Sequence, residues 1–404
     1  MERWKQNLYV VGIAQFMGFC SLAFVMSFLP LYIKTLGVTD PGSAAVWSGI
    51  LMGTAAFFAA ISGPVWGSIG DRRGRKAMVE RVLLANTVLI SFMAFASSPW
   101  HLLILRSFQG ALGGFAAASI ALVTSITPEG RIGFALGFYQ FAMTAGVALG
   151  PLLGGYLADT LSFSAAFLVM AGLSLASVIL VRFYVYEKFT PPKPNQKSQG
   201  FFETLKHLLS NRTLLAMLMV NFMVQYSLVI ATPIIPLFIQ SLDPGSSRIT
   251  TMTGLIIAAG GTASALSAIF LGKLSDRIGH RKILIICALG AAAANLLQVP
   301  VSSTWQFLAL RIIGGLFTGG MLPSSNALIS NLIPSEHRGT AFGVATSFSL
   351  LGNVFGPISG GLLGASQLGY RGVFSITAGM LLLTTLWIKA AVKPPAGTGQ
   401  KLFT

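Results

Sequence analysis

Charged side chains are scarce in this chain, which has 27 Lys and Arg but only 11 Asp and Glu among 404 residues. A soluble globular protein carries about 25% charged residues, whereas the share here is 9%. So few charges cannot cover the surface of one or two water-soluble domains of this length. Cysteine is scarce as well, and two cysteines exclude a disulfide framework. The composition therefore predicts a polytopic membrane protein.

Sequence motifs for nucleotide binding, metal binding and catalysis are also missing. We find no nucleotide-binding P-loop, no cluster with metal-ligand spacing and no nucleophile beside a base. We therefore expect no enzyme activity, no cofactor and no metal site. The net charge of +16 would favour a nucleic-acid partner only if a polar domain presented it as a basic patch, and no such domain is present.

Long apolar runs are what the sequence does contain. About 20 apolar residues cross a bilayer as a helix, and these runs are too long and unbroken for the alternating strands of a barrel. We predict twelve transmembrane helices, at residues 8–33, 46–70, 77–97, 100–124, 132–158, 163–186, 213–239, 250–274, 282–301, 304–329, 338–366 and 370–392.

Basic residues predict the orientation of these helices, because loops rich in Lys and Arg stay in the cytoplasm. With the N-terminus inside, 22 of the 27 Lys and Arg fall on the cytoplasmic side. The outer loops hold only Lys34, Arg248 and Arg371, while Arg106 and Arg311 fall inside spans. We therefore expect a multi-pass protein of the plasma membrane with both termini in the cytoplasm.

A polar stretch near the middle divides the chain. Residues 187–212 are rich in proline and polar side chains, as in a linker. Within it, residues 201–209 place their apolar side chains on one helical face, which predicts a short amphipathic helix on the cytoplasmic surface. The predicted domains are an N-terminal six-helix bundle (1–186), this linker (187–212), a C-terminal six-helix bundle (213–392) and a cytoplasmic tail (393–404).

The two halves repeat each other. The clearest markers recur in the same order at offsets of 205 or 206 residues: Asp71 and Asp276, Arg106 and Arg311, Pro151 and Pro357, and Pro30 and Pro236. Six spans repeated once, with a binding site where the halves meet, are typical of secondary transporters. The predicted fold class is therefore all-α, with twelve transmembrane helices in two six-helix halves.

Three motifs make the chain resemble the major facilitator superfamily. The loop after the second span resembles motif A and returns in the second half: Gly67, Asp71, Arg72, Gly74, Arg75 and Lys76, then Asp276 and Arg277. The fourth span resembles motif B: Leu102, Arg106, Gln109 and Gly110. The fifth span resembles motif C, which is typical of exporters: Gly146, Gly150, Pro151, Gly154 and Gly155. Together the motifs resemble those of the twelve-span drug:proton antiporters. The stretch Phe28–Tyr32 resembles bacterial multidrug exporters of the MdtG and PmrA type.

The resemblance implies roles for two of these motifs. Motif A would form a gate in which Asp71 links the cytoplasmic ends of the halves, with Gly67 and Gly74 allowing close helix packing and a tight turn; the alternative is a solvated basic loop. The glycines of motif C recur every fourth residue and strip one helix face to backbone, which suits helices that slide on each other. Ordinary small-residue packing is the alternative, and it applies equally around Pro357.

Proton coupling poses a difficulty, because none of the 11 acids lies in the middle of a predicted span. The candidates for coupling are Arg106, Gln109, Asp159 and Arg311. Arg106 lies about 9 Å deep, where a charge is expected to face the bundle interior, and Gln109 and Gln140 are its expected partners. Arginine does not deprotonate in proteins, so it would tune a neighbouring group.

A substrate cavity needs apolar and aromatic walls with a few polar groups. Spans 1, 4, 5, 7 and 10 offer these candidates: Gln15, Phe19, Phe115, Tyr139, Gln140, Asn221, Gln225, Tyr226 and Asn326.

The predicted function is export of amphipathic small molecules or drugs across the bacterial inner membrane by alternating access, as in antibiotic resistance. A proton is the expected counter-ion. The alternatives are a dedicated exporter of a metabolite, siderophore, sugar or lipid, an uncoupled facilitator, and a non-transporting sensor. The expected partners are the substrate, the proton and the lipid bilayer, with no nucleic acid, and the chain is expected to be a monomer.

Overall fold

The computed structural model describes residues 3–187, 212–333 and 338–392, and all regular structure in these residues is helical. The first part contains α1 (Arg3–Ala23), η1 (Phe24–Ser27), α2 (Leu29–Thr35), α3 (Pro41–Arg73), α4 (Arg75–Met93), α5 (Pro99–Ala111), α6 (Phe115–Ile126), η2 (Glu129–Arg131), α7 (Ile132–Thr160) and α8 (Phe163–Tyr184). The second part contains α10 (Arg212–Val229), η3 (Thr232–Ile234), α11 (Ile235–Leu242), α12 (Ile249–Ile278), α13 (His280–Gln298), α14 (Thr304–Thr318), α15 (Met321–Leu332), α16 (Arg338–Ala365) and α17 (Gly369–Ala391).

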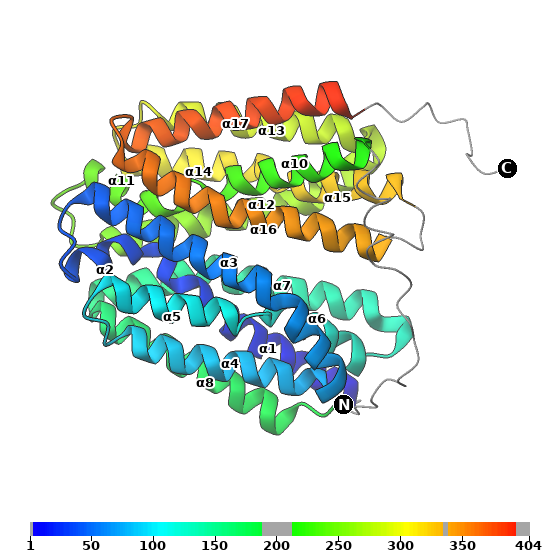
Figure 1. The fold of residues 1–404 in the computed structure, drawn as a ribbon. Helices are drawn as coiled ribbons and strands as arrows, with labels where there is room; N and C mark the ends of the chain where they lie inside the picture. Colours follow the sequence, from blue (N-terminus) through cyan, green and yellow to red (C-terminus); the bar gives the residue numbers. More distant parts are fainter. Residues whose placement is uncertain (1–2, 188–211, 334–337, 393–404) are drawn as a thin grey trace.

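The helices form two bundles side by side (Figure 1), with α1 to α8 in one and α10 to α17 in the other. This is the all-α, two-half architecture that the sequence predicts. The amphipathic helix expected at residues 201–209 and the tail at 393–404 lie outside the described residues.

One predicted span contains more charged residues than an apolar membrane-spanning helix. Eleven helical segments among the described residues are long and apolar enough to cross a membrane, one fewer than the twelve predicted. The missing segment is α4, which occupies the predicted span 77–97 and packs against α5, α6 and α8. Its first two turns contain Arg75, Lys76, Glu80 and Arg81. By position α4 completes the first bundle, but its first third is charged.

Four predicted spans are interrupted, and the interruptions repeat between the halves. Span 1 divides into α1, η1 and α2, and span 7 divides into α10, η3 and α11. Pro30, Pro233 and Pro236 lie at the first or second position of the segments that follow the interruptions. A proline costs no hydrogen bond there, because the N–H groups of the first helical turn have no intrahelical partner.

Span 4 breaks between α5 and α6, and span 10 is interrupted at the equivalent place, between α14 and α15. At the first break, Gly114 adopts a left-handed φ of +96°. Trp66 Nε1 donates to the carbonyl oxygen of Ala111 at 2.7 Å, and Arg81 Nη2 donates to that of Gly113 at 2.9 Å. The guanidinium of Arg81 also stacks on the Trp66 ring, 3.4 Å from its centroid. Carbonyl groups left free by the break are thus satisfied from neighbouring helices.

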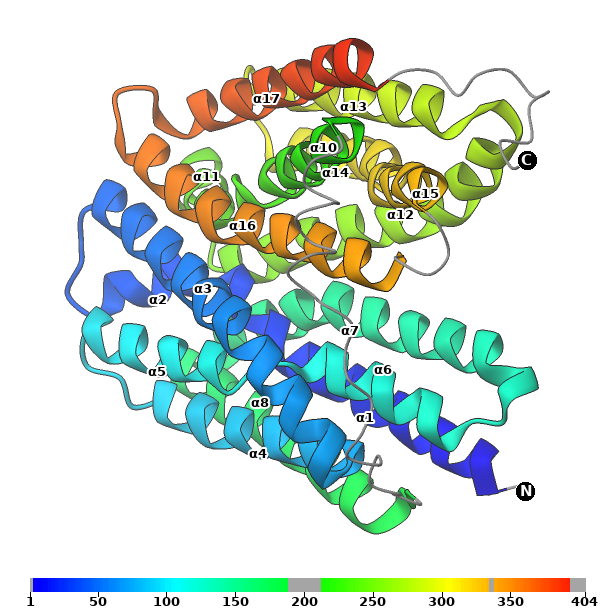
Figure 2. The same cartoon turned by 45° about the vertical axis from the view of Figure 1, so that its right-hand side comes forward.

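The two ends of the molecule differ in charge. At the basic end, α3 ends with Arg72 and Arg73, α4 begins with Arg75 and Lys76, and α12 has Arg277 in its last turn. At the opposite, distal end, α3 and α12 begin while α7 and α16 end. Figure 2 shows α3 beside α16 at the distal end and their ribbons diverging toward the basic end.

The apolar core follows the same division. One cluster contains residues of both halves, among them Phe28 and Phe167 from the first and Phe238 and Phe374 from the second. Its members come largely from the distal parts of the helices. The two other clusters are each confined to one half. Among the described residues, the halves therefore share an apolar core only toward the distal end.

Candidate functional site

Four glycines bring the two halves into backbone contact at the distal end. In each pair a side chain on the glycine would overlap a carbonyl oxygen of the other half: Gly155 with Thr250, Gly254 with Pro151, Gly361 with Ala45, and Gly49 with Pro357. The repeat relates the first two pairs, between α7 and α12, to the last two, between α16 and α3. We call these four pairs the distal glycine contacts. A larger residue in any of them would push the halves apart.

Three other glycines of motif C serve a contact within the first half. A Cβ atom at Gly146, Gly150 or Gly154 would lie 2.5, 2.7 or 2.7 Å from backbone oxygens of α1 and η1. The neighbouring Pro151 and Gly155 face α12 of the other half. Motif C therefore lets α7 pack closely on its own half and on the opposite half at once.

The copy of motif C in α16 makes matching contacts. Gly352 would bring a Cβ to 2.8 Å from the backbone nitrogen of Tyr226 in α10, and Gly360 approaches the carbonyl oxygen of Ile230. Gly361 faces α3 of the first half. Both copies thus combine packing within a half with contact between halves.

Asp159 joins the halves next to the distal glycine contacts. Its carboxylate, near the end of α7, accepts hydrogen bonds from the backbone N–H and hydroxyl of Thr250 at 3.3 and 2.6 Å. It accepts two more from the same groups of Thr251, both at 2.7 Å. A carboxylate that accepts N–H groups of the first helical turn caps the helix and complements its dipole. Here the cap of α12 comes from the other half, with Lys34 in the same small cavity and Arg248 just before the helix.

Two further polar contacts lie at the distal end. Lys34 Nζ of α2 donates to Gln240 Oε1 of α11 at 3.0 Å and so links the halves again. Asp40 caps α3 by accepting the N–H of Ser43 at 2.7 Å. Hydrogen bonds from the side chain and backbone of Ser43 lower the pKa of Asp40. That carboxylate therefore stays charged at the N-terminus of the helix, where the dipole favours it.

Arg106 is buried, as predicted, and a chain of polar side chains meets its charge. Nη1 of Arg106 donates to Gln109 Oε1 at 2.9 Å, and Gln109 Nε2 donates to Asn86 Oδ1 at 2.5 Å. Asn86 Nδ2 then donates to Ser21 Oγ at 3.1 Å. The chain links α5 through α4 to α1. Gln109 is the expected partner, but the expectation for Gln140 is wrong, because Gln140 is exposed and donates at 3.4 Å to a threonine of its own helix.

Gln109→Leu is expected to lower the free energy of unfolding by about 1.5–3 kcal/mol, because it leaves the buried guanidinium of Arg106 without its acceptor. Gln140→Leu is the matched control, since its amide is exposed. Thermal unfolding of the purified variants measures the difference. Equal midpoints for the two variants would contradict the role given to Gln109.

Arg311 repeats Arg106 in sequence but has different surroundings. In the part of the chain that the structure describes, no hydrogen bond or ion pair involves its guanidinium, which lies 5.6 Å from the centroid of the Phe307 ring. Together with Asn295 and Gln298 it lines a cavity of about 390 Å³. The second half therefore keeps the arginine without the chain of partners.

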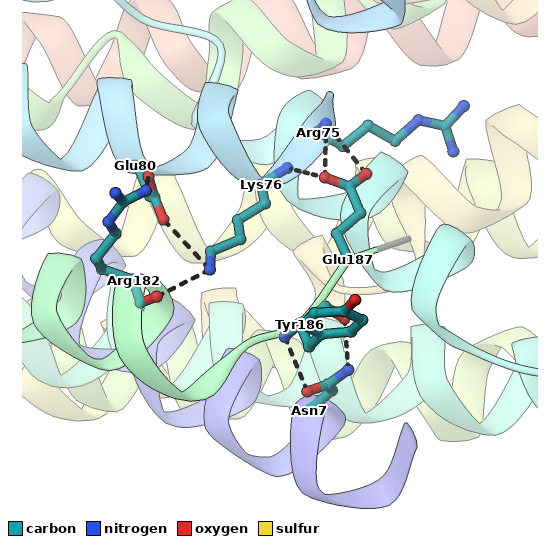
Figure 3. Close-up of polar contacts among 7 residues, drawn as sticks. All are labelled: Asn7, Arg75, Lys76, Glu80, Arg182, Tyr186 and Glu187. Atoms are coloured by element: carbon teal, nitrogen blue, oxygen red, sulfur yellow. Dashed lines mark hydrogen bonds and ion pairs between the residues drawn. The ribbon is translucent and has the colours of Figure 1, made fainter. Parts of the chain in front are cut away.

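Motif A is tied to the end of the first half by Glu187 (Figure 3). The carboxylate accepts the backbone N–H of Arg75 at 3.1 Å and that of Lys76 at 2.8 Å, and so caps α4. Lys76 Nζ donates to the carbonyl oxygen of Arg182 at 2.8 Å and lies 3.7 Å from Glu80. Arg182 lies 3.5 Å from the other oxygen of Glu80. The end of α8 is thus held against the start of α4.

Glu187→Ala is expected to destabilise the protein by about 1 kcal/mol, the usual cost of a lost helix cap. Glu129→Ala offers a control at the basic end, because Glu129 is exposed in η2. The measurement is the unfolding midpoint of both variants in the same detergent. A Glu187→Ala midpoint no lower than that of the control would show that the cap contributes nothing.

The other motif A residues can be compared with the gate that the sequence predicts. Gly74 has a φ of +94° between α3 and α4, as a tight turn requires. At Gly67 no atom lies within 4 Å of a Cβ position, so the close packing expected there is absent from this conformation. The side chain of Asp71 lies outside the described part of the structure. In the second copy, Asp276 is exposed and lies 3.9 Å from His280. Arg72 and Arg277 are exposed as well.

The nine predicted cavity residues do not form one site. Three of them pack together in the apolar cluster of the first half, where the rings of Phe19 and Phe115 lie 4.9 Å apart beside Tyr139. Buried in the core are Gln15, Phe115, Tyr139 and Asn221. Half-buried are Phe19, Gln225 and Tyr226, and exposed are Gln140 and Asn326. None of the nine lines the cavity at Arg311. Gln225 and Tyr226 instead link α10 to α16, through Asn353 at 2.9 Å and Ser359 at 2.7 Å.

Several functional candidates were missed from the sequence. Asn86 and Gln298 are amides inside apolar runs, a costly placement that could have marked them. Thr250 and Thr251 follow each other at the start of a predicted span, where an acid can cap a helix. No metal site adds to these candidates, because no three His, Cys, Asp or Glu residues converge anywhere in 3–187, 212–333 or 338–392.

Comparisons with known proteins point to one family. The sequence model of the Major Facilitator Superfamily matches residues 11–262 and again residues 222–403. The multidrug resistance protein MdtG of Serratia proteamaculans (strain 568) is 34% identical over 386 residues, which are 95% of this chain and 93% of that protein. The MdtG protein of Salmonella dublin is also 34% identical over 387 residues, 95% of each chain.

Solved structures show the same fold at low identity. A mutant of the nucleoside transporter NupG superposes with a TM-score of 0.79 at 15% identity, over 96% of this chain and all (100%) of that one. A D-xylose–proton symporter gives 0.77 at 17% identity, over 96% and 98%. A bacterial homologue of the human lysosomal transporter Spinster, in an inward-facing and occupied conformation, gives 0.76 at 15% identity, over 95% and 96%.

Proposed function

Because the chain belongs to the Major Facilitator Superfamily, we propose that it is a secondary transporter that exports amphipathic small molecules, drugs among them, from bacterial cells by alternating access. The relatives that match along the whole chain are multidrug resistance proteins of Serratia and Salmonella. They are transport proteins and not enzymes, in line with the sequence prediction. Because the sequence has no nucleotide-binding motif, we infer that an ion or substrate gradient drives transport.

One observation supports this proposal most directly: the four distal glycine contacts join the halves in the distal parts of α3, α7, α12 and α16. Loops rich in Lys and Arg face the cytoplasm, so the basic end is cytoplasmic and the distal end faces outward. With the distal end closed, the structure corresponds to an inward-facing state. Alternating access then requires the distal glycine contacts to separate while the basic ends of the two bundles approach each other.

Proton coupling is proposed to pass through Asp159. A protonated carboxyl group is a poorer acceptor for the N–H groups of Thr250 and Thr251 and no longer complements the helix dipole. Proton uptake from outside would therefore weaken the cap of α12 and favour opening of the distal end. Arg106 and Gln109 would act within the first half by keeping α1, α4 and α5 together during this movement.

The test is flux in proteoliposomes that contain the purified protein and no other transporter. We expect a fluorescent amphipathic drug to move faster under an imposed pH gradient than without one. Flux that is independent of the gradient would identify an uncoupled facilitator, and the absence of flux for every cargo would identify a sensor. A rate limited to one metabolite would identify a dedicated exporter.

The same proposal includes the cellular context of the protein. We place it in the bacterial inner membrane as a monomer, with both termini in the cytoplasm and residues 187–212 joining two six-helix domains, 1–186 and 213–392, ahead of a tail at 393–404. Cysteine accessibility tests the orientation, because Cys20 and Cys287 are buried and leave a low background. A cysteine at Thr39, in an exposed distal loop, should react with a reagent that cannot cross the membrane.

A further inference from the structure

We propose that the C-terminal half contains a subsite for the anionic group of a transported amphiphile, formed by Arg311 and Gln298. The inference rests on the proposed transport function and names the charge class of its substrate. Carboxylate, phosphonate and sulfonate groups share the chemistry that such a subsite would recognise.

The subsite lies in a cavity of about 390 Å³ against the interruption of span 7. Its polar lining consists of Ser227, Thr232, Ser264, Asn295, Gln298, Arg311 and Thr318. Met26 and Val147 line it from the first half, so the cavity touches both halves. A ligand held there would contact both of the bodies that move against each other in alternating access.

The lining favours an anion because its one charged group is the positive guanidinium of Arg311. The only ionisable side chain in the lining is Arg311, and no Asp or Glu is present. The hydroxyl and amide groups around it can donate hydrogen bonds, and the planar guanidinium donates two in parallel to a carboxylate or phosphonate. A cationic drug would find no counter-charge in this cavity.

The internal repeat shows that the free guanidinium is specific to the second half. Arg106 donates to Gln109, and the residue equivalent to Gln109 is Gly314. The second link of the chain, Asn86, corresponds to Ala291. The second half thus retains the arginine and replaces both amides by small residues that accept no side-chain hydrogen bond. A ligand can supply the acceptor that the described residues do not provide.

Gln298 supplies an independent indication. Its side chain is 1% exposed, and its Oε1 atom has no hydrogen-bond partner among the described residues. A buried polar atom without a partner is costly. Because the amide borders the same cavity as Arg311, a bound molecule with a hydroxyl or amide next to its acid could satisfy Gln298 and Arg311 together.

The experiment uses three probes that share a ring system: 2-naphthylacetate, 2-naphthylacetamide and 2-(2-naphthyl)ethylammonium. Calorimetric titration is done with the full-length protein in nanodiscs of zwitterionic lipid, without any gradient. We expect the anion to bind the wild type more tightly than the amide, and the cation to bind most weakly. In Arg311→Gln the affinity for the anion should fall about ten- to hundred-fold, while that for the amide changes less than about two-fold.

Two further variants keep the result interpretable. Lys273→Gln removes one positive charge from the exposed basic end of the same half and should leave all three affinities unchanged. Arg311→Lys keeps the charge and should restore part of the preference for the anion. Equal loss of the anionic and neutral probes in a monodisperse Arg311→Gln protein, or no preference for the anion in the wild type, would overturn the proposal.

This binding measurement is separate from the test of transport. Charge-selective binding without flux in proteoliposomes would contradict the export function and leave the subsite in place. Flux without charge-selective binding would contradict the subsite and leave export in place.

Discussion

Transport by a Gly155→Val variant is expected to fall below about a tenth of the wild-type rate. A side chain at Gly155 overlaps the carbonyl oxygen of Thr250, and neither helix backbone can yield locally. Overpacking of this kind costs about 1–3 kcal/mol, which shifts the equilibrium between distal-closed and distal-open states by roughly 5- to 150-fold. The measurement is drug flux in proteoliposomes at matched protein content.

A distance measurement shows whether Gly155→Val loses transport because the halves separate at the distal end. Spin labels on cysteines at Thr39 and Ser247, both exposed at the distal end, report the separation of the halves. We expect Gly155→Val to move the distance distribution to longer values. Gly172→Val is the control, because a Cβ atom at Gly172 in α8 meets no atom within 4 Å. Normal flux with an unchanged distribution would refute the importance of the distal glycine contacts.

The repeat extends this prediction to the other helix pair. Gly361 stands to Ala45 as Gly155 stands to Thr250, so Gly361→Val should also open the distal end. If the two contacts close as one unit, the double variant Gly155→Val/Gly361→Val should lose little more transport than either single variant. Once the first valine has opened the distal end, the second one no longer overlaps the opposite helix.

The sequence predicts the helices better than their interruptions. Twelve apolar runs and the basic loops are enough to find the two bundles, since the bilayer sets the length of a span and the loops set its direction. The break at Gly113–Gly114 has a visible signal in the glycine pair, but glycine is tolerated inside membrane helices. What decides the break is support from Trp66 and Arg81, which lie on other helices.

Contacts between the halves were predictable only as far as the repeat is symmetric. The glycines of motif C and its copy point to close packing, and the offset between them relates the two helix pairs. Residues that occur in only one half cannot be found by comparing the halves. The position equivalent to Asp159 is Ala365, and the one equivalent to Gln109 is Gly314. The partners of Asp159 are 91 and 92 residues away in the chain. No local pattern can indicate a cap supplied over that distance.

Asp159→Asn is expected to remove the stimulation of drug flux by a pH gradient, lowering the gradient-driven rate about ten-fold or more. The asparagine keeps the shape of the side chain but has one acceptor oxygen in place of two and carries no charge. Two N–H groups of α12 then face a single acceptor and an amide donor, so the cap is weakened at every pH. Loss of one hydrogen bond to a charged group accounts for a ten-fold effect.

Exchange of drug across the membrane without a gradient should persist in Asp159→Asn, because it needs movement of the halves but no proton. Asp243→Asn is the matched control, since Asp243 is an exposed acid of a distal loop. Flux at a series of outside pH values should remain pH-dependent in the wild type and in the control and become flat in Asp159→Asn. If Asp159→Asn keeps the wild-type pH dependence, the proton passes elsewhere. Coupling would then involve Arg106 and its polar chain, which form the buried charged network of the first half.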